Sequence, residues 1–402
     1  MKEVFGQSKL IVIALFISAM FSCEKEPVNN QPDPEPVDTI VAAGHYRNPL
    51  TVEHEDLMAD KTEGIADPSV FRWMGKYYLM STQYYSNHGG EEGFKVWESI
   101  DLVEWKYIGA TQVQNFIWEV LWSPELYYYR GDFYIYLSGP YGEMAVWKYE
   151  VPADVVNPNP FGVEAHWVAV THNYLQVADH AIDGSLLIEP NGDKYMFFSG
   201  LNGVKYRKVN SMTDGNGEDV IQLGQCTVDN IVIGGGTVGT VGWTEAPTCF
   251  KHNNKYYMTY TGNHYLRPDY QVHLAVGNSL QDIVPIADNP FIFHNSGEWT
   301  GTGNCYPVVG PNLKDYYYTY HTKKGYRISA EDDVYRKLML DKVEFTATGI
   351  NSEAPTFDDR LIPELAEYRN DFSNGTEGLK IIGNVEKGSF ALNVDATATK
   401  RS

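Results

Sequence analysis

The sequence predicts an all-β protein made of five similar units, and two observations support this. A tight turn followed by an aromatic strand recurs at intervals of about 60 residues, the length of a four-stranded sheet with its loops. Helical periodicity is nearly absent between the copies. Sheets of this kind form a ring in a five-bladed β-propeller, which is the fold that we expect. The copies read GKYYL, GDFYI, GDKYM, NKYYM and KDYYY, and they begin at Gly75, Gly131, Gly192, Asn254 and Lys314.

The innermost strand of each blade is predicted just before each turn, where a short segment ends in an apolar run. Innermost strands of a propeller surround one axis, so their equivalent positions converge on the mouth of the central channel. The segments are 66–71, 122–129, 181–189, 243–250 and 301–309, and the residues expected at their heads are Asp67, Ser123, Asp183, Glu245 and Asn304.

Three of these head residues, Asp67, Asp183 and Glu245, are carboxylates. Acids that converge in a partly desolvated funnel make little sense for stability, because each negative neighbour raises the free energy of ionisation. The alternative is that each acid caps its own turn, since Asp before Pro or Gly often does so. Glu is a poor turn cap, so Glu245 argues most strongly for a function.

The chain from about residue 44 to about residue 363 resembles the five-bladed propeller enzymes of glycoside hydrolase family 43. Any one of the shared motifs is weak, but five of them occur here in the order and spacing of the family. They are Ala-Asp-Pro at 66–68, SIDLVEWKYIG at 99–109, Trp-Ser-Pro-Glu at 122–125, Ile-Asp-Gly at 182–184 and Thr-Glu-Ala-Pro at 244–247.

This resemblance implies an inverting glycosidase with Asp67 as the general base and Glu245 as the general acid. One carboxylate activates water on one face of the sugar, while a protonated carboxyl delivers a proton to the leaving oxygen on the other face. The resemblance implies that Asp183 orients Glu245 and raises its pKa, because a negative neighbour favours the protonated form.

The substrate expected from the resemblance is an α-L-arabinofuranoside, cleaved by exo action. The family also contains β-D-xylosidases and some galactosidases, which remain alternatives. A propeller that binds glycans without cleaving them is an alternative of another class, but it has no need of an acid, a base and a tuning group together. Fructan-cleaving relatives carry Asn-Asp-Pro, whereas Ala66 precedes Asp67 here.

Substrate and metal contacts can also be assigned to positions. Trp122 and Trp243 lie beside head positions, and their rings could stack on the C–H face of a sugar. Many family members carry Gly-His beside a metal or water site in blade five, where this chain has Gly303-Asn304-Cys305. An Asn can still offer an oxygen ligand, so a structural calcium ion at Asn304 stays open, and no cofactor is required.

The composition agrees with a neutral partner. The net charge of -21 argues against nucleic acid, because phosphate binding relies on clustered Lys and Arg. We therefore expect a neutral oligosaccharide or polysaccharide as substrate, and a monomeric protein. Three cysteines remain after Cys23 is set aside, so they cannot all pair, and a bridge between Cys249 and Cys305 stays open.

The N-terminus predicts export and a lipid anchor. Lys2 and Lys9 precede an apolar run at 10–21, which is too short to span a bilayer and has the proportions of a signal-peptide core. Ser22-Cys23 with the acidic stretch after it resembles the lipobox of a Bacteroidetes surface lipoprotein, in which Cys23 is lipidated. The alternative is an ordinary cleaved signal peptide with a chance Cys. We expect an outer-membrane lipoprotein at the cell surface or the periplasmic face, touching the membrane only through this anchor.

The chain is accordingly divided into four parts. Residues 24–40 are Pro-rich and polar, which is typical of an extended tether. The expected parts are a signal peptide at 1–22, the lipid-anchored Cys and linker at 23–40, the catalytic propeller at 41–363, and a C-terminal tail or the start of an accessory β module at 364–402.

Overall fold

The structure is a computed structural model that describes residues between 43 and 366. The predicted signal peptide, Cys23 and the linker lie outside the described residues, as do Cys226 and Trp243. Among the residues that are described, no helix is long and apolar enough to cross a membrane. Between 43 and 366, the residues that are not described are 56–63, 85–92, 112, 115–119, 156–157, 163–164, 171–174, 176, 179, 201–202, 224–230, 234–235, 239–243, 266, 295–296, 325–334 and 347–348.

Five sets of four antiparallel strands make up the described fold, and in each set the strands pair in chain order. The first set is β2 (Ala66–Trp73), β3 (Lys76–Tyr84), β4 (Phe94–Ser99) and β5 (Lys106–Thr111). The second is β7 (Val120–Tyr129), β8 (Asp132–Ser138), β9 (Met144–Tyr149) and β10 (Trp167–Ala169). The third is β11 (Ile182–Ile188), β12 (Lys194–Gly200), β13 (Gly203–Val209) and β14 (Ile221–Gln222). The fourth is β17 (Thr244–His252), β18 (Lys255–Gly262), β19 (Gln271–Gly277) and β20 (Val284–Pro285). The fifth is β21 (Trp299–Val309), β22 (Tyr316–Lys324), β23 (Tyr335–Phe345) and β24 (Ile350–Ser352).

One further strand pairing and several short elements complete the described structure. The end of β3 pairs with the start of β7, which joins the first two sets into one sheet. The other described elements are β1 (His45–Tyr46) paired with β25 (Arg360–Leu361), β6 (Val113–Gln114) parallel to β10, β15 (Ile231–Ile233) paired with β16 (Gly236–Val238), and a 3-10 helix η2 (Leu280–Asp282).

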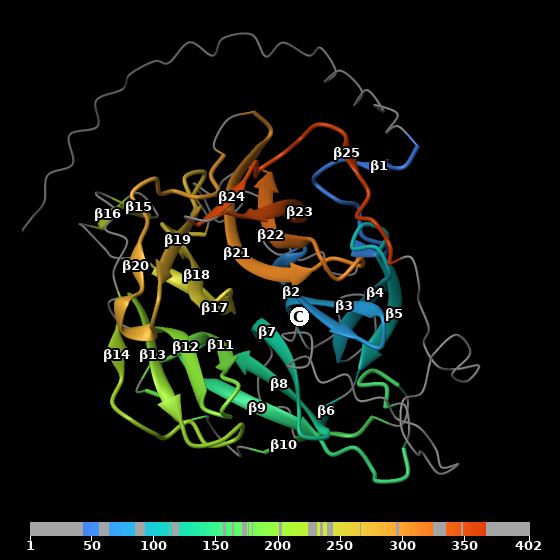
Figure 1. Ribbon diagram of the computed structural model, residues 1–402, viewed down its shortest axis with the longest axis vertical. Coiled ribbons are helices and arrows are strands. Elements are labelled where there is room, and N and C mark those ends of the chain that lie inside the picture. Colours follow the sequence, from blue (N-terminus) through green and yellow to red (C-terminus); the bar gives the residue numbers. More distant parts are fainter. Residues whose placement is uncertain are drawn as a thin grey trace, which may run out of the picture. The chain divides into compact units, whose positions relative to one another are not determined.

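The first strands of the five sets form a closed ring. Strand β2 contacts β7, β7 contacts β11, β11 contacts β17, β17 contacts β21, and β21 contacts β2 again (Figure 1). Each set is therefore a blade, and the predicted five-bladed β-propeller is confirmed.

Aromatic and aliphatic side chains fill the space between neighbouring blades. Both faces of a blade are covered, so its strands are apolar on both sides rather than on alternate residues. In β8, for example, every residue from Phe133 to Ser138 is buried. Cys249 and Cys305 are buried in two different clusters as free thiols, so the open question of a bridge between them is answered.

Every innermost strand carries the same β-bulge near its start. Two residues of the strand lie opposite one residue of the next strand, and the first of the two has a positive φ that non-glycine residues seldom adopt. The first bulge residues are Asp67 (φ 48°), Ser123 (47°), Asp183 (53°), Ala246 (53°) and Asn304 (53°).

The fourth position corrects a prediction. Ala246, and not Glu245, is the structural equivalent of Asp67 and Asp183, because Glu245 still pairs in register with Thr261 and the bulge begins one residue later. Glu245 therefore occupies the position that Trp122 has in the second blade, where the pairing partner is Ser138. The acid reaches the site from a different backbone position than the two aspartates.

Candidate active site

A ring of hydrogen bonds between blades fixes the five bulges. In every blade, the backbone N–H of the first bulge residue donates to a side chain on the second strand of the preceding blade, at the residue that pairs just ahead of that blade's own bulge. The bonds run from Ser123 N to Thr82 Oγ1 (2.9 Å), Asp183 N to Ser138 Oγ (2.7 Å), Ala246 N to Ser199 Oγ (2.9 Å), Asn304 N to Thr261 Oγ1 (3.0 Å) and Asp67 N to His321 Nδ1 (3.2 Å). The ring holds the backbone of the candidate residues in place from blade to blade.

Asp67 is held as an ionised carboxylate. Its Oδ2 accepts a hydrogen bond from Thr82 Oγ1 at 2.5 Å, and Arg336 Nη1 lies 3.3 Å from Oδ1. Burial alone would raise the pKa of Asp67, but Arg336 and the surrounding hydrogen-bond donors outweigh it, so the pKa lies below its usual value. Burial and Arg336 lower the pKa of His321 to about 3, so the imidazole is neutral when Asp67 ionises. Arg336 is therefore the cation that stabilises the charged carboxylate.

Asp183 lies in an environment that favours its protonated form. Asp183 Oδ2 lies 3.2 Å from both Ala246 N and Ser199 Oγ, each of which donates to it. Burial, then the negative charge of Glu245 and then that of Asp67, raise the pKa of Asp183 well above its usual value. Like charges repel mutually, so the two acids are best described as a coupled pair that takes up a proton together. Asp183 is close enough to Glu245 and Asp67 for both negative charges to act on it, so all three predicted carboxylates lie in one site.

Asn304 of the fifth blade contacts both Ser123 of the second blade and Asp67 of the first. Asn304 Nδ2 donates to Ser123 Oγ at 3.0 Å, and the Asn304 side chain also hydrogen-bonds to Asp67. Calcium takes six to eight oxygen ligands, which can be carboxylate, carbonyl, amide or water oxygens. The described residues contain no group of three or more His, Cys, Asp and Glu that could hold a metal ion. The calcium ion that the sequence left open at Asn304 stays a prediction.

The aromatic candidates are only partly described. Trp122 is half-buried in β7, one residue ahead of Ser123. Trp243 falls outside the described residues. Both remain predictions as sugar contacts.

The sequence analysis missed two residues of the site, Arg336 and Tyr270. Arg336 comes from β23, and the hydroxyl of Tyr270 donates to Glu245 Oε1 at 2.6 Å. Two basic residues, Arg336 and Lys337, at the start of the strand segment YRKLML were the one available signal for Arg336. Nothing in the local sequence distinguishes Tyr270 from the other tyrosines.

Another buried acid, Glu125, lies just beyond the bulge of β7. It is 6% exposed, accepts a hydrogen bond from Tyr127 and is also hydrogen-bonded to Ser185 of the next blade. Burial raises its pKa to about 8, against an ordinary value of 4.5. Glu125 is therefore largely protonated at neutral pH and belongs to the packing between blades two and three.

We expect Glu125 to make the folded state less stable as the pH rises. Since the folded pKa is raised, its stabilising effect is complete below pH 4.5 and is lost as the pH rises toward 8. The free energy of unfolding should fall there by up to about 1.4 kcal/mol per pH unit. Urea unfolding of wild type and Glu125→Gln at several pH values tests this. The slope should flatten in Glu125→Gln but not in the exposed control Glu218→Gln, and parallel curves would contradict the assignment.

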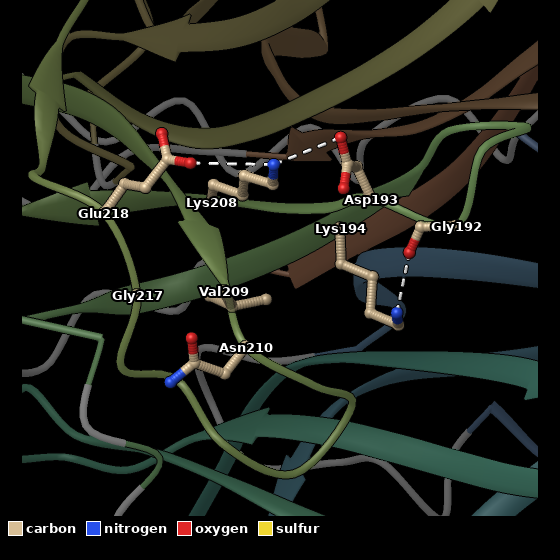
Figure 2. A pocket seen from close by; sticks show the side chains of 8 residues that line it. All are labelled: Gly192, Asp193, Lys194, Lys208, Val209, Asn210, Gly217 and Glu218. Atoms are coloured by element: carbon tan, nitrogen blue, oxygen red, sulfur yellow. Dashed lines mark hydrogen bonds and ion pairs between the residues drawn. The ribbon is translucent and has the colours of Figure 1, made fainter.

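One surface pocket lies on the third blade, away from the predicted catalytic carboxylates. It is lined by residues around the β11–β12 turn and after β13, which is the opposite end of β11 from Asp183. Figure 2 shows Lys208 between the carboxylates of Asp193 and Glu218, at 3.1 and 3.6 Å. Its charged groups neutralise one another, and the pocket contains none of the predicted site residues.

Comparison with known proteins agrees with the propeller fold. The model of the family "Glycosyl hydrolases family 43" matches residues 62–351. No curated protein matches the chain. Among solved structures, a thermostable family-43 glycoside hydrolase is 23% identical with a TM-score of 0.58, covering 75% of this chain and 96% of its own. An endo-1,4-beta-xylanase from Bacteroides thetaiotaomicron is 23% identical with a TM-score of 0.57, over 76% and 98%. An exo-1,5-alpha-L-arabinanase from a bovine ruminal metagenomic library is 16% identical with a TM-score of 0.54, over 72% and 96%.

Proposed function

Because the chain belongs to glycosyl hydrolase family 43 and is an inverting glycoside hydrolase, we propose that it is an exo-acting α-L-arabinofuranosidase. In this proposal Asp67 is the general base, Glu245 is the general acid, and Asp183 tunes the acid. The observation that carries these three roles is the contrast between the environments of Asp67 and Asp183 in one site. Arg336 holds the pKa of Asp67 below its usual value, whereas burial and then the negative charge of Glu245 raise the pKa of Asp183.

The chemistry follows from this contrast. Asp67 removes a proton from a water molecule, whose oxygen attacks the anomeric carbon of the sugar. As the glycosidic bond breaks, Glu245 gives its proton to the leaving oxygen, so the product sugar has the inverted configuration. The reaction ends with Asp67 protonated and Glu245 ionised, and proton exchange with solvent restores both. Asp183 supports the first state of this cycle, because its charge disfavours ionisation of Glu245.

The choice of sugar rests on weaker support. The Ile-Asp-Gly and Thr-Glu-Ala-Pro motifs are more similar to the arabinofuranosidase branches of the family, and an arabinanase is among the similar structures. A β-D-xylosidase or galactosidase is the alternative within the family, and a xylanase is also among the similar structures. A glycan-binding propeller without activity is the alternative of another class.

A panel of 4-nitrophenyl glycosides tests the sugar. The mature chain should hydrolyse the α-L-arabinofuranoside and leave the β-D-xyloside and β-D-galactoside largely intact. Proton NMR at early times should show arabinose of inverted configuration. Turnover of another glycoside would replace the sugar and keep the mechanism. Binding of arabinan or xylan oligosaccharides without any cleavage would favour the glycan-binding alternative.

We further propose that the protein is anchored to the outer membrane through a lipid on Cys23, and that it acts as a monomer. The support is the sequence alone: the apolar run at 10–21, Ser22-Cys23 and the acidic residues after it. Cys23→Ser should abolish labelling by radioactive fatty acid and move the protein to the soluble fraction, while Cys226→Ser should change neither. Membrane association that persists without label would contradict the anchor.

A further inference from the structure

We infer that Tyr270 is a positioning residue for the general acid, fixing the carboxyl group of Glu245 so that one of its oxygens faces the leaving group. This inference rests on the proposed function. No motif pointed to Tyr270, and it enters the site only through the folded chain.

The contact itself is short and specific. The Tyr270 hydroxyl donates to Glu245 Oε1 at 2.6 Å, and Tyr270 is only 2% exposed. A neutral carboxyl group accepts best at its carbonyl oxygen, so a hydrogen bond at Oε1 favours the proton on Oε2. The bond thus selects the oxygen that delivers the proton, and it removes rotational freedom from the acid before the substrate binds.

The backbone of Tyr270 is tied on both sides. Its N–H donates to Arg267 O at 3.3 Å, and its carbonyl oxygen accepts from Thr302 N of the fifth blade at 2.8 Å. Arg267 is in turn clamped by both oxygens of Asp269, each at 2.7 Å. The segment before β19 is therefore a rigid support rather than a free loop.

The ring of Tyr270 is also held in place. It stacks on His321 with a centroid distance of 5.8 Å and an interplanar angle of 14°. On blade five, a Cβ built on Gly303 would lie 1.9 Å from the ring carbon Cε1 of Tyr270. The ring occupies the space that a side chain at 303 would need, which gives this glycine a steric reason. Lys323 Nζ lies 5.6 Å from the ring centroid, at a distance typical of a cation–π contact.

The charges around Tyr270 keep its hydroxyl a donor. Burial, then the negative charges of Glu245 and Asp67, raise the pKa of Tyr270 well above its usual value. The phenol stays protonated at every pH at which the enzyme is active, so Glu245 is always the acceptor of this hydrogen bond. This neutral donor also stabilises the Glu245 carboxylate that forms after proton transfer, without the permanent positive charge that would favour its ionisation beforehand.

Dependence on the leaving group tests this role. A 4-nitrophenolate ion leaves without much acid assistance, whereas a sugar hydroxyl needs the proton. Tyr270→Phe should lower kcat/KM about 10- to 100-fold for 1,5-linked arabinotriose and less than about 3-fold for 4-nitrophenyl α-L-arabinofuranoside. Gly303→Ala should give the same pattern, because it displaces the ring while the hydroxyl remains.

Tyr318→Phe is the matched control. Tyr318 is also fully buried, and its hydroxyl has no hydrogen-bond partner among the described residues, so its loss should leave both activities near wild type. Equal losses on both substrates in Tyr270→Phe, or no loss on either, would overturn the positioning role. Glu245→Gln separates the two levels of the argument. If Glu245→Gln shows no dependence on the leaving group, the proposed acid is wrong, whereas if only Tyr270→Phe lacks it, the inference alone fails.

Discussion

Asp67→Asn should lower kcat by about 10²- to 10⁴-fold on every substrate, including 4-nitrophenyl glycosides. The base acts on water, and water must be deprotonated whatever the leaving group is. Arg336 keeps the wild-type carboxylate ionised, and an amide in its place cannot take a proton from water. Steady-state kinetics with an activated and a natural substrate measure the two losses, which should be similar.

The loss in Asp67→Asn must be separated from a loss of fold. Replacing Asp67 breaks its ion pair with the buried Arg336, and breaking a buried ion pair costs about 3–5 kcal/mol. Urea unfolding therefore accompanies the kinetics. Azide is a nucleophile that needs no deprotonation, so it should restore turnover of 4-nitrophenyl α-L-arabinofuranoside by Asp67→Ala and give a glycosyl azide of inverted configuration. A folded Asp67→Asn variant with near wild-type kcat would contradict the assignment of the base.

The fold was predictable because the same physical requirement repeats in every blade. Each sheet buries both faces against its neighbours, so every copy needs a turn and a strand of large aromatic residues, such as Tyr77 and Tyr78 in the first blade or Tyr256 and Tyr257 in the fourth. That requirement is local in sequence and visible without a structure.

The register of the fourth blade is also visible in the sequence, in the positions of three prolines. Pro68, Pro124 and Pro247 are each the second residue of a bulge, where a missing N–H does not interrupt the strand pairing. Aligning these prolines makes Ala246, and not Glu245, the equivalent of Asp67. The carboxylates are a misleading guide to the register, because Glu245 lies one residue ahead of the position equivalent to Asp67.

The surroundings of the carboxylates could not be predicted from local sequence. Arg336 is separated from Asp67 by most of the chain and reaches it only because blade five closes the ring against blade one. His321 likewise reaches Asp67 across the contact between blades five and one, whereas Tyr270 meets Glu245 within blade four, 25 residues further along the chain. These residues set the protonation states on which the mechanism depends, so the roles of the acids follow from the folded chain.

Glu245→Gln should separate substrates by their leaving groups. For an arabinan oligosaccharide, kcat should fall by about 10²- to 10⁴-fold, because the amide has no proton to give to the leaving sugar oxygen. For 4-nitrophenyl α-L-arabinofuranoside the loss should be far smaller, since 4-nitrophenolate leaves unassisted. The descending limb at high pH, where the acid ionises in wild type, should disappear from the residual activity.

Glu245→Gln is close in shape to the wild type and keeps an oxygen that can accept the Tyr270 hydroxyl, so its fold should be unchanged. Asp183→Asn is the informative companion, because it keeps the proton donor and removes the charge that disfavours ionisation of Glu245. With that charge gone, the pair binds its proton less tightly, so the descending limb should move to lower pH while some activity on oligosaccharides remains. Equal loss on both substrates in Glu245→Gln would assign this residue to binding or folding rather than to proton transfer. A limb that stays in place in Asp183→Asn would show that Glu245 and Asp183 titrate independently, against the coupling that their shared burial implies.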